Sequence, residues 1–212
     1  MALLKLENIC FSYDKKKNLN NISYDFEAGA IYAIVGKSGA GKTTMLSLLS
    51  GLATPTSGNI IYNEKDISNI NKYDYRSKYV GVIFQNFNLL SKLTAVENVV
   101  LSMDISGSKE REKKARAYEL LESVGLDRDE ANRRILKLSG GQQQRVAIAR
   151  ALSYNPDIIL ADEPTGNLDG ETQDDIMDIF RGLANQGKCV IIVTHSPEVA
   201  KRADQVYEIK RR

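Results

Sequence analysis

The sequence has little that would suit secretion or membrane insertion. Its only two cysteines, Cys10 and Cys189, lie far apart and form no C-x-x-C pair, so we expect reduced thiols in a reducing compartment. No apolar run approaches the length that crosses a bilayer, and the N-terminus lacks the basic, apolar and small-residue order of a secretory signal. We therefore expect a cytoplasmic chain that works at a membrane only through another polypeptide.

The sequence also lacks a strong excess of either charge. Its 29 Lys and Arg residues nearly balance 27 Asp and Glu residues, which gives a formal net charge of +2. A basic cluster at residues 109–116 interleaves with glutamates, and this favours a solvated helix face over a nucleic-acid surface. With 212 residues, of which 42% are hydrophobic, we predict one domain over residues 1–212 with a single sizeable core.

A glycine-rich loop at residues 36–44 fits the phosphate-binding pattern G-x-x-x-x-G-K-[ST]. Apolar residues predict a buried strand before the loop and a helix after it, and this context makes a chance match the weaker alternative. Glycines let the backbone curl so that its N–H groups point at phosphate oxygens. The start of the following helix contributes its positive dipole end, and Lys42 contributes a positive charge. Thr43 offers a hydroxyl for Mg²⁺. The predicted triphosphate-binding residues are Gly36, Lys37, Ser38, Gly39, Ala40, Gly41, Lys42, Thr43 and Thr44.

Polar residues also follow three other predicted strands. Residues 79–84, 157–161 and 189–194 are followed by Gln85, by Asp162 and Glu163, and by His195. Ligands bind at the carboxyl ends of parallel strands. Paired acids there suit Mg²⁺ bound to phosphate, with Asp162 holding the ion and Glu163 orienting or deprotonating water. On position alone, a structural role is favoured for both Gln85 and His195.

The N-terminal region has a different pattern. Residues 4–11 and 22–26 alternate apolar and polar side chains, which predicts antiparallel strands with one wet face, joined by a loop at 14–21. Tyr13 ends the first strand, where its ring could stack on a nucleobase; an ordinary half-buried tyrosine is an equal alternative.

Helical signals dominate residues 88–137. Thr94 can cap a helix through Glu97, and residues 109–124 carry apolar side chains on one helical face. We predict an inserted helical subdomain there, after a polar and irregular segment at residues 72–78.

A second helix start lies at residues 139–142, which we call the SGGQ segment. Ser139 can cap the helix, and Gly140 and Gly141 expose its first amides. The segment therefore predicts a second anion-binding helix start, with a plain helix cap as the alternative.

Together these motifs closely resemble the ATP-binding cassette (ABC) family over essentially the whole chain. Residues 36–44 resemble its Walker A loop, Gln85 its Q-loop, residues 138–142 its LSGGQ signature, residues 158–163 its Walker B motif, residues 166–169 its D-loop, His195 its switch histidine and Tyr13 its adenine-stacking aromatic residue. The resemblance implies an α/β fold of the ABC type: a mostly parallel core sheet, an N-terminal antiparallel β-subdomain and an inserted α-helical subdomain at 88–137.

The resemblance also implies how the two helix starts are used. In this family two cassettes pack head to tail, and each ATPase site draws on both chains. Ser139, Gly140, Gly141 and Gln142 would then close on the γ-phosphate held by the partner chain, with Asp169 of the D-loop at the dimer interface. Within the chain, Lys42 would hold ATP, Glu163 would act as general base and His195 would position the γ-phosphate and water. Mg²⁺ would bind near Thr43, Asp162 and Gln85.

Residues 164–169 and 88–99 look most like the lipoprotein-releasing and macrolide- or peptide-exporter branch, although residues 133–137 lack the proline common there. The resemblance implies an ATP-hydrolysing transporter subunit at the cytoplasmic face of the membrane. Its partners would be a separate integral-membrane permease and a second cassette, with no nucleic acid expected. The competing hypothesis is a soluble ABC ATPase acting on nucleic acid or ribosomes. Such proteins usually carry a second cassette or long coiled-coil insertions, for which this chain has no room.

Overall fold

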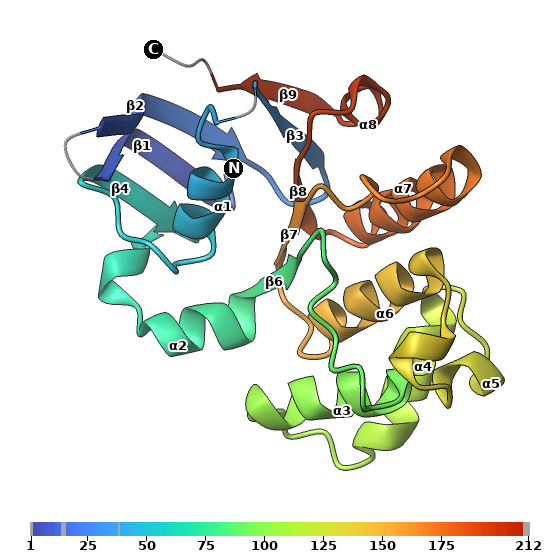
Figure 1. The fold of residues 1–212 in the computed structure, drawn as a ribbon. Helices are drawn as coiled ribbons and strands as arrows, with labels where there is room; N and C mark the ends of the chain where they lie inside the picture. Colours follow the sequence, from blue (N-terminus) through green and yellow to red (C-terminus); the bar gives the residue numbers. More distant parts are fainter. Residues whose placement is uncertain (1, 14–15, 38, 210–212) are drawn as a thin grey trace.

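Two β-sheets of different type organise the chain (Figure 1). The computed structural model describes residues 2–13, 16–37 and 39–209, except for the side chains of residues 13 and 16–18. The antiparallel sheet has the strand order β2-β1-β4-β5 and comprises β1 (Leu4–Tyr13), β2 (Lys16–Phe26), β4 (Ser57–Tyr62) and β5 (Lys65–Asp66). The parallel sheet has the order β6-β7-β8-β3-β9 and comprises β3 (Ile31–Val35), β6 (Val80–Ile83), β7 (Ile158–Asp162), β8 (Cys189–Val193) and β9 (Gln205–Glu208).

The central strands of the parallel sheet are buried on both faces, as their continuous apolar runs predict. Because successive side chains of a strand point to opposite faces, each strand serves two apolar clusters. Ile158 and Leu160 pack with α1 (Lys42–Leu49) and the antiparallel sheet. Ile159 and Ala161 pack on the other face, against α6 and α7. The parallel sheet therefore joins the two halves of the molecule.

Helices cover the second face of the parallel sheet, and most of them lie in the chain between β6 and β7 (Figure 1). They are α3 (Ala95–Ile105), α4 (Lys113–Ser123), α5 (Arg128–Ala131), a 3-10 turn (Ile135–Lys137) and α6 (Gly140–Leu152), followed after β7 by α7 (Gly170–Asn185) and α8 (Pro197–Lys201). The predicted cap of α3 is present, because Thr94 and Glu97 bond to each other's backbone amides. None of the helices in the described ranges is long and apolar enough to cross a membrane.

Three local expectations were wrong. Residues 16–21 belong to β2 and not to a loop, because they continue the antiparallel pairing with β1 as far as Tyr13 opposite Lys16; residues 14 and 15 lie outside the described residues. β2 is an edge strand, and its Asn20 and Asn21 side chains are exposed, so polar residues fit there and no hydrophobic pattern marks the strand. Helix α4 begins at Lys113, four residues later than predicted.

The segment at 72–78 is helical and not irregular. It forms α2 (Lys72–Asp74) and a π-helical turn (Tyr75–Tyr79). Asn71 caps α2 through the amides of Tyr73 and Asp74. Tyr75 is buried, and its hydroxyl donates to the carbonyl of Leu49. A single buried side chain in a polar segment holds the turn in place, and no periodic pattern reveals it.

Candidate nucleotide site

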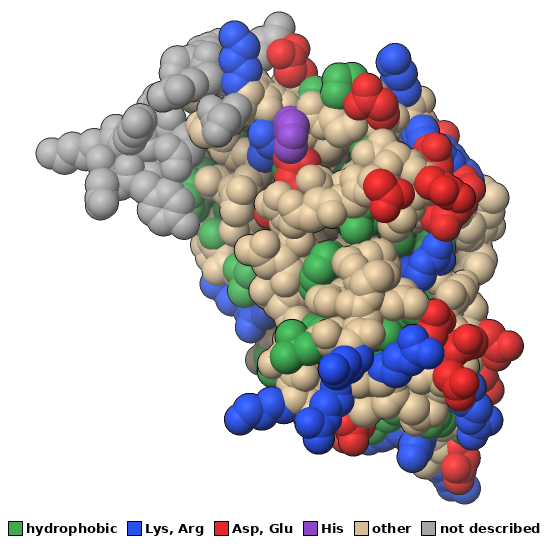
Figure 2. All heavy atoms as spheres, turned by 45° about the vertical axis from the view of Figure 1, so that its right-hand side comes forward, with side chains coloured by type: hydrophobic (Ala, Val, Ile, Leu, Met, Phe, Trp, Pro, Cys, Tyr) green, Lys and Arg blue, Asp and Glu red, His purple; other side chains and the backbone are tan. Residues whose placement is uncertain are grey.

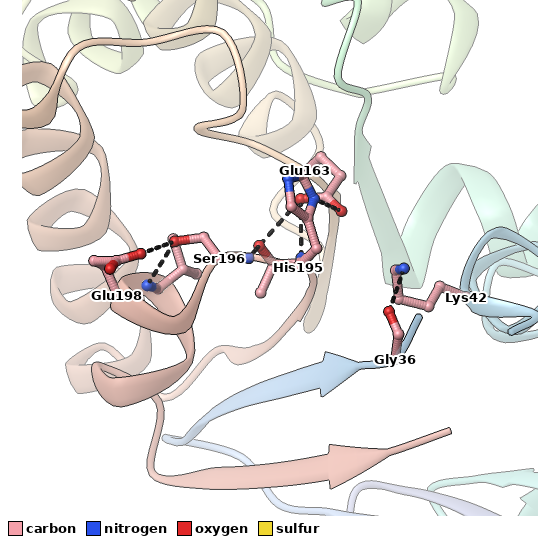
Figure 3. A network of polar contacts seen from close by, with 8 residues as sticks. Gly36, Lys42, Glu163, His195, Ser196 and Glu198 are labelled. Atoms are coloured by element: carbon pink, nitrogen blue, oxygen red, sulfur yellow. Dashed lines mark hydrogen bonds and ion pairs between the residues drawn. The ribbon is translucent and has the colours of Figure 1, made fainter. Parts of the chain in front are cut away.

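The glycine-rich loop joins β3 to α1 and turns through backbone conformations that favour glycine. Gly39 and Gly41 have φ angles of +74° and +105°, in the left-handed region. Position 36 favours glycine for a different reason, because a Cβ there would lie only 2.8 Å from the carbonyl oxygen of Ile209. The Lys42 Nζ donates to the Gly36 carbonyl over 2.8 Å, so the lysine bends back over the loop (Figure 3). Ser38 lies outside the described residues, as does the side chain of Tyr13.

Helix α1 presents its first turn to this loop. Its apolar residues Met45, Leu46, Leu48 and Leu49 are buried, which fixes the helix against the sheet. In the part of the chain that the structure describes, no side chain caps its N-terminus, and Thr43 is exposed there. Its first amides and its positive dipole end are therefore available to an anion.

Three neighbouring strands end beside the loop. β8 pairs in parallel with β3 on one side and β7 on the other. Beyond the strands, the Glu163 amide donates to the Val193 carbonyl over 2.8 Å, and the Thr194 amide donates to the Ile34 carbonyl over 3.1 Å. The sheet thus brings Asp162, Glu163, His195 and the loop to one edge, as the position of each after a parallel strand predicts.

Glu163 is the best-connected side chain at this edge. Its Oε2 accepts the Thr194 hydroxyl over 3.1 Å and the His195 amide over 3.3 Å. Its Oε1 lies 2.7 Å from Nδ1 of His195. Its own backbone is in the left-handed region, with φ at +46°, which is unusual for a residue with a long side chain. The carboxylate is therefore held in one place by the end of β8 (Figure 3).

The two partners of this contact differ in exposure. The Glu163 side chain is 13% exposed, whereas the His195 side chain is 70% exposed. Figure 2 shows the histidine in purple at the surface, with acidic side chains beside it. The same view shows basic and acidic side chains along the right-hand side and the lower end of this face, with mainly uncharged side chains at its centre.

Three effects act on the pKa of Asp162, the last residue of β7. Burial raises the pKa of its carboxyl above the ordinary value of 3.8, the charge of Glu163 adds to the rise, and Lys42 opposes it. Two neighbouring carboxyl groups have more acceptor oxygens than the single Lys42 ammonium can satisfy, which favours a second cation at this edge. In the described ranges no three His, Cys, Asp or Glu residues form a cage for a metal. The donor set instead fits Mg²⁺, which binds through one or two protein oxygens and substrate phosphates.

Gln85 follows β6 and reaches the same edge. Its Nε2 lies 3.4 Å from the position that a Cβ would take on Gly166, and Glu163 lies within 3.7 Å of that position. Phe87 and Asn88, which follow Gln85 closely in the chain, both have positive φ angles. The backbone carbonyls of both residues accept hydrogen bonds from the guanidinium of Arg150. Burial lowers the pKa of Arg150. Arg150 is not among the residues that the sequence predicts for the site, because one arginine in a helical pattern carries no signal of its contacts.

The SGGQ segment forms a complete helix start on α6. The Ser139 hydroxyl accepts the Gln142 amide over 3.2 Å, and the Gln142 side chain accepts the Ser139 amide over 2.8 Å. The Gln142 Nε2 also donates to Glu130 over 2.6 Å. Gly141 packs so closely on α7 that a Cβ would lie 2.6 Å from Cγ2 of Thr172.

Asp169 caps α7 at this contact. Its carboxylate accepts the Thr172 amide over 2.9 Å and the Thr172 hydroxyl over 3.0 Å. The bond from the Thr172 amide lowers the pKa of Asp169 most, and the bond from the Thr172 hydroxyl lowers it further. Within residues 2–13, 16–37 and 39–209, no hydrogen bond or ion pair links the SGGQ segment to the glycine-rich loop. The structure thus gathers the loop, Gln85, Asp162, Glu163 and His195, and leaves the SGGQ segment in a separate contact group with Asp169.

A family model described as "ABC transporter" matches residues 19–166, which include the glycine-rich loop, Gln85, the SGGQ segment and Glu163. The chain belongs to the ABC transporter family. The cassette is 45% identical over 207 residues to the ABC transporter ATP-binding protein YclH of Bacillus subtilis (strain 168), covering 96% of this chain and 92% of the relative. It is 43% identical over 215 residues to the ABC transporter ATP-binding protein YvrO of the same organism, covering 98% and 93%.

Solved structures of a related cassette agree with the fold. The dimeric post-hydrolysis state of the ATP-binding cassette MJ0796, bound to ADP and Pi, matches with a TM-score of 0.87 and 37% identity over 98% of this chain and 97% of that one. Another dimeric MJ0796 structure, a bacterial ABC transporter cassette, matches with a TM-score of 0.86 and 38% identity over the same shares of the two chains. The predicted family, ABC fold and ATPase activity are confirmed. The roles of single residues and the subdomain boundary at 88–137 stay predictions.

Proposed function

We propose that this cassette works in a head-to-tail dimer and drives a separate integral-membrane permease from the cytoplasmic face of the membrane. One observation carries the proposal: the helix starts at Lys42 and at Ser139, which we infer both face the triphosphate, share no hydrogen bond or ion pair within the described residues. A site built from one of each needs a second chain, and a two-fold dimer supplies two such sites. MJ0796, with 37% identity, forms dimers.

In each site, one chain would supply the glycine-rich loop, Lys42 and Thr43 around the triphosphate, and the partner would supply the SGGQ segment. Thr43, Asp162 and Gln85 would hold Mg²⁺, directly or through water. When bound, Mg²⁺ supplies positive charge at the β- and γ-phosphate oxygens. The separation of the two helix starts would make hydrolysis depend on dimer closure.

Glu163 would be the general base of the reaction. The water oxygen bonds to the γ-phosphorus, the bond from that phosphorus to the bridging oxygen of ADP breaks, and the proton of the water passes to Oε1 of Glu163. The contact between His195 and that oxygen supports the proposal that the ring positions the γ-phosphate and the water.

Mixing two inactive variants tests the shared site. Lys42→Ala inactivates the loop of its own chain, and Ser139→Arg blocks the helix start that the partner needs. In an equal mixture, half of the dimers pair the two variants and keep one intact site each, so about a quarter of the wild-type ATPase rate returns. A mixture as inactive as either variant alone would contradict the shared site.

We further propose that the permease is an exporter of lipoprotein, peptide or drug, because residues 164–169 and 88–99 resemble that branch. The helical subdomain at 88–137 and the neighbourhood of Gln85 would contact the permease. The test is affinity capture of Glu163→Gln with Mg-ATP from detergent-solubilised cells of the native host, followed by mass spectrometry. A multi-span permease with a large extracytoplasmic domain is expected. Ribosomal or nucleic-acid components without a permease would instead support the soluble class of ABC ATPase.

A further inference from the structure

Thr194, the residue after β8, makes a contact with Glu163 that no motif assigned. Its side chain is 1% exposed, and its hydroxyl lies 3.1 Å from Oε2 of Glu163. The same hydroxyl oxygen lies 3.0 Å from the amide nitrogen of Ser196. The threonine therefore stands between the start of α8 and the carboxylate.

These two contacts fix the direction of the hydroxyl. A threonine hydroxyl has one hydrogen to donate and two lone pairs that accept. The Ser196 amide can only donate, so it occupies a lone pair. An ionised Glu163 can only accept, so the single hydroxyl hydrogen points at Oε2. The Thr194 hydroxyl is thus a directed donor to the carboxylate.

Hydrogen bonds anchor both supports of the hydroxyl. The Thr194 amide is bonded to the Ile34 carbonyl of β3, directly before the glycine-rich loop. Ser196 is held as the N-cap of α8, where its hydroxyl accepts the Val199 amide over 3.3 Å and donates to Glu198 over 2.9 Å. Figure 3 shows this chain of contacts running from Glu198 through Ser196 to Glu163. A donor fixed between the sheet and a helix start can hold a carboxylate within a narrow range of positions.

The two oxygens of Glu163 are held differently as a result. Oε2 accepts from the buried Thr194 hydroxyl and from the backbone amide of His195. Oε1 faces the His195 ring, which is 70% exposed. The fixed oxygen Oε2 orients the group, which leaves Oε1, beside the exposed His195 ring, as the oxygen that can face water.

We propose that Thr194 is a positioning residue for hydrolysis: it holds Oε2 of Glu163 so that Oε1 faces the attacking water. The inference rests on the proposed function, in which Glu163 is the general base. Thr194 takes no proton in the reaction, since its hydroxyl keeps its hydrogen while the proton of the water passes to Oε1. Its removal costs orientation of the base, and not nucleotide binding.

The experiment compares Thr194→Val with Thr194→Ser in the full chain. Valine keeps the shape and removes the hydroxyl, whereas serine keeps the hydroxyl and removes only a methyl group. We expect Thr194→Val to lower kcat for Mg-ATP about 10- to 100-fold, with KM and the Kd for ATP within about twofold of wild type. Thr194→Ser should keep most of the wild-type kcat. Thr54→Val, which removes a hydroxyl that accepts a hydrogen bond from the Lys72 ammonium and, within the described ranges, bonds to no predicted site residue, is the matched control and should leave kcat unchanged.

A double variant separates positioning from a structural role. In the Glu163→Gln background, where the base is absent, Thr194→Val should cause no further loss of the residual rate, because the hydroxyl then has no base to position. An equal fractional loss in both backgrounds would show a structural role and overturn the inference. If Thr194→Val fails to fold, Thr194→Cys replaces it, since a thiol of similar size is a weak donor and should give an intermediate kcat.

The outcomes also distinguish this inference from the proposed function. A wild-type kcat in Thr194→Val would overturn the role of Thr194 alone. A wild-type kcat in Glu163→Gln would overturn the general base, and the positioning role with it. Three results would together support the inference: loss of kcat in Thr194→Val, rescue by Thr194→Ser, and no added loss when Thr194→Val is combined with Glu163→Gln.

Discussion

The Nδ1 atom of His195 lies 2.7 Å from Oε1 of Glu163, although the two residues are 32 positions apart in the chain. Two parallel strands cause this meeting, because β7 and β8 are neighbours and each residue follows the end of its strand. The contact joins an exposed ring to a nearly buried carboxylate. It therefore fixes the position of the Glu163 carboxylate relative to the His195 ring.

Replacing Glu163 by glutamine should separate binding from hydrolysis. The amide keeps the shape and can still contact Thr194 and His195, but it cannot accept the proton of water. We expect ATP affinity to stay near that of wild type, kcat to fall about 10²- to 10⁴-fold, and dimers to accumulate with ATP. Titration with a fluorescent ATP analogue measures the affinity, steady-state ATPase assays measure kcat, and gel filtration with ATP measures the dimer. Glu122→Gln, on the exposed face of α4, is the matched control, and a wild-type rate in Glu163→Gln would remove this residue from the proposed mechanism.

Replacing Lys42 by alanine should weaken nucleotide binding itself. The ammonium group bends over the glycine-rich loop to the Gly36 carbonyl, so it sits where a phosphate would enter. Loss of a charged hydrogen bond lowers ATP affinity about 10- to 100-fold. Titration with a fluorescent ATP analogue gives the Kd. Lys65→Ala, in β5 and away from the site, should bind as wild type does, and an unchanged Kd in Lys42→Ala would refute the assignment of the loop.

Much of the fold and of the site could be predicted from the sequence because local chemistry and global fold agree there. β3 and α1 flank the glycine-rich loop as their apolar runs predict, and the Thr94 and Ser139 caps form as their three-residue spacings predict. Gln85, Glu163 and His195 follow parallel strands, so strand order alone brings them to one edge.

The rest depends on contacts that no spacing encodes. The edge position of β2 lets a polar run be a strand, and the buried Tyr75 makes a helical turn of a polar segment. Thr194 looks like the last residue of an apolar strand, and only its distance to Glu163 shows its contact. Likewise, only the three-dimensional structure shows that Arg150 donates hydrogen bonds to the carbonyls of Phe87 and Asn88.

Adding a methyl group at Gly141 should destabilise the packing of α6 on α7. A Cβ there would lie 2.6 Å from Cγ2 of Thr172, so the threonine must move and its bonds to Asp169 weaken. We expect Gly141→Ala to lower the free energy of unfolding by about 1 to 3 kcal/mol in urea denaturation. Adding Thr172→Ser, which removes Cγ2 and keeps the hydroxyl, should restore most of the loss.

Gly140 provides the control for this steric argument. A Cβ at Gly140 would meet only Cδ2 of Leu168, at the ordinary distance of 3.7 Å. Gly140→Ala should therefore leave the free energy of unfolding unchanged or slightly raised, since alanine suits a helix better than glycine. Equal destabilisation by both substitutions would mean that backbone conformation, and not the contact with Thr172, is what alanine disturbs.

Removing the charge of Asp162 should stabilise the fold while it abolishes hydrolysis. Burial, then the charge of Glu163, raises the pKa of Asp162 above 3.8, so the ionised form is less stable in the folded chain than in the unfolded one. This penalty is fully present above the raised pKa and vanishes below 3.8, where both states are protonated. Asp162→Asn should therefore raise the free energy of unfolding at pH 7.5, by an amount that shrinks as the pH falls toward 4.

Asp204→Asn is the control of opposite sign, because a hydrogen bond from Arg181 lowers the pKa of Asp204 and its stabilisation is present at pH 7.5 and lost in acid. Urea denaturation across this pH range measures both differences, and a destabilised Asp162→Asn chain at pH 7.5 would mean that the attraction of Lys42 outweighs burial.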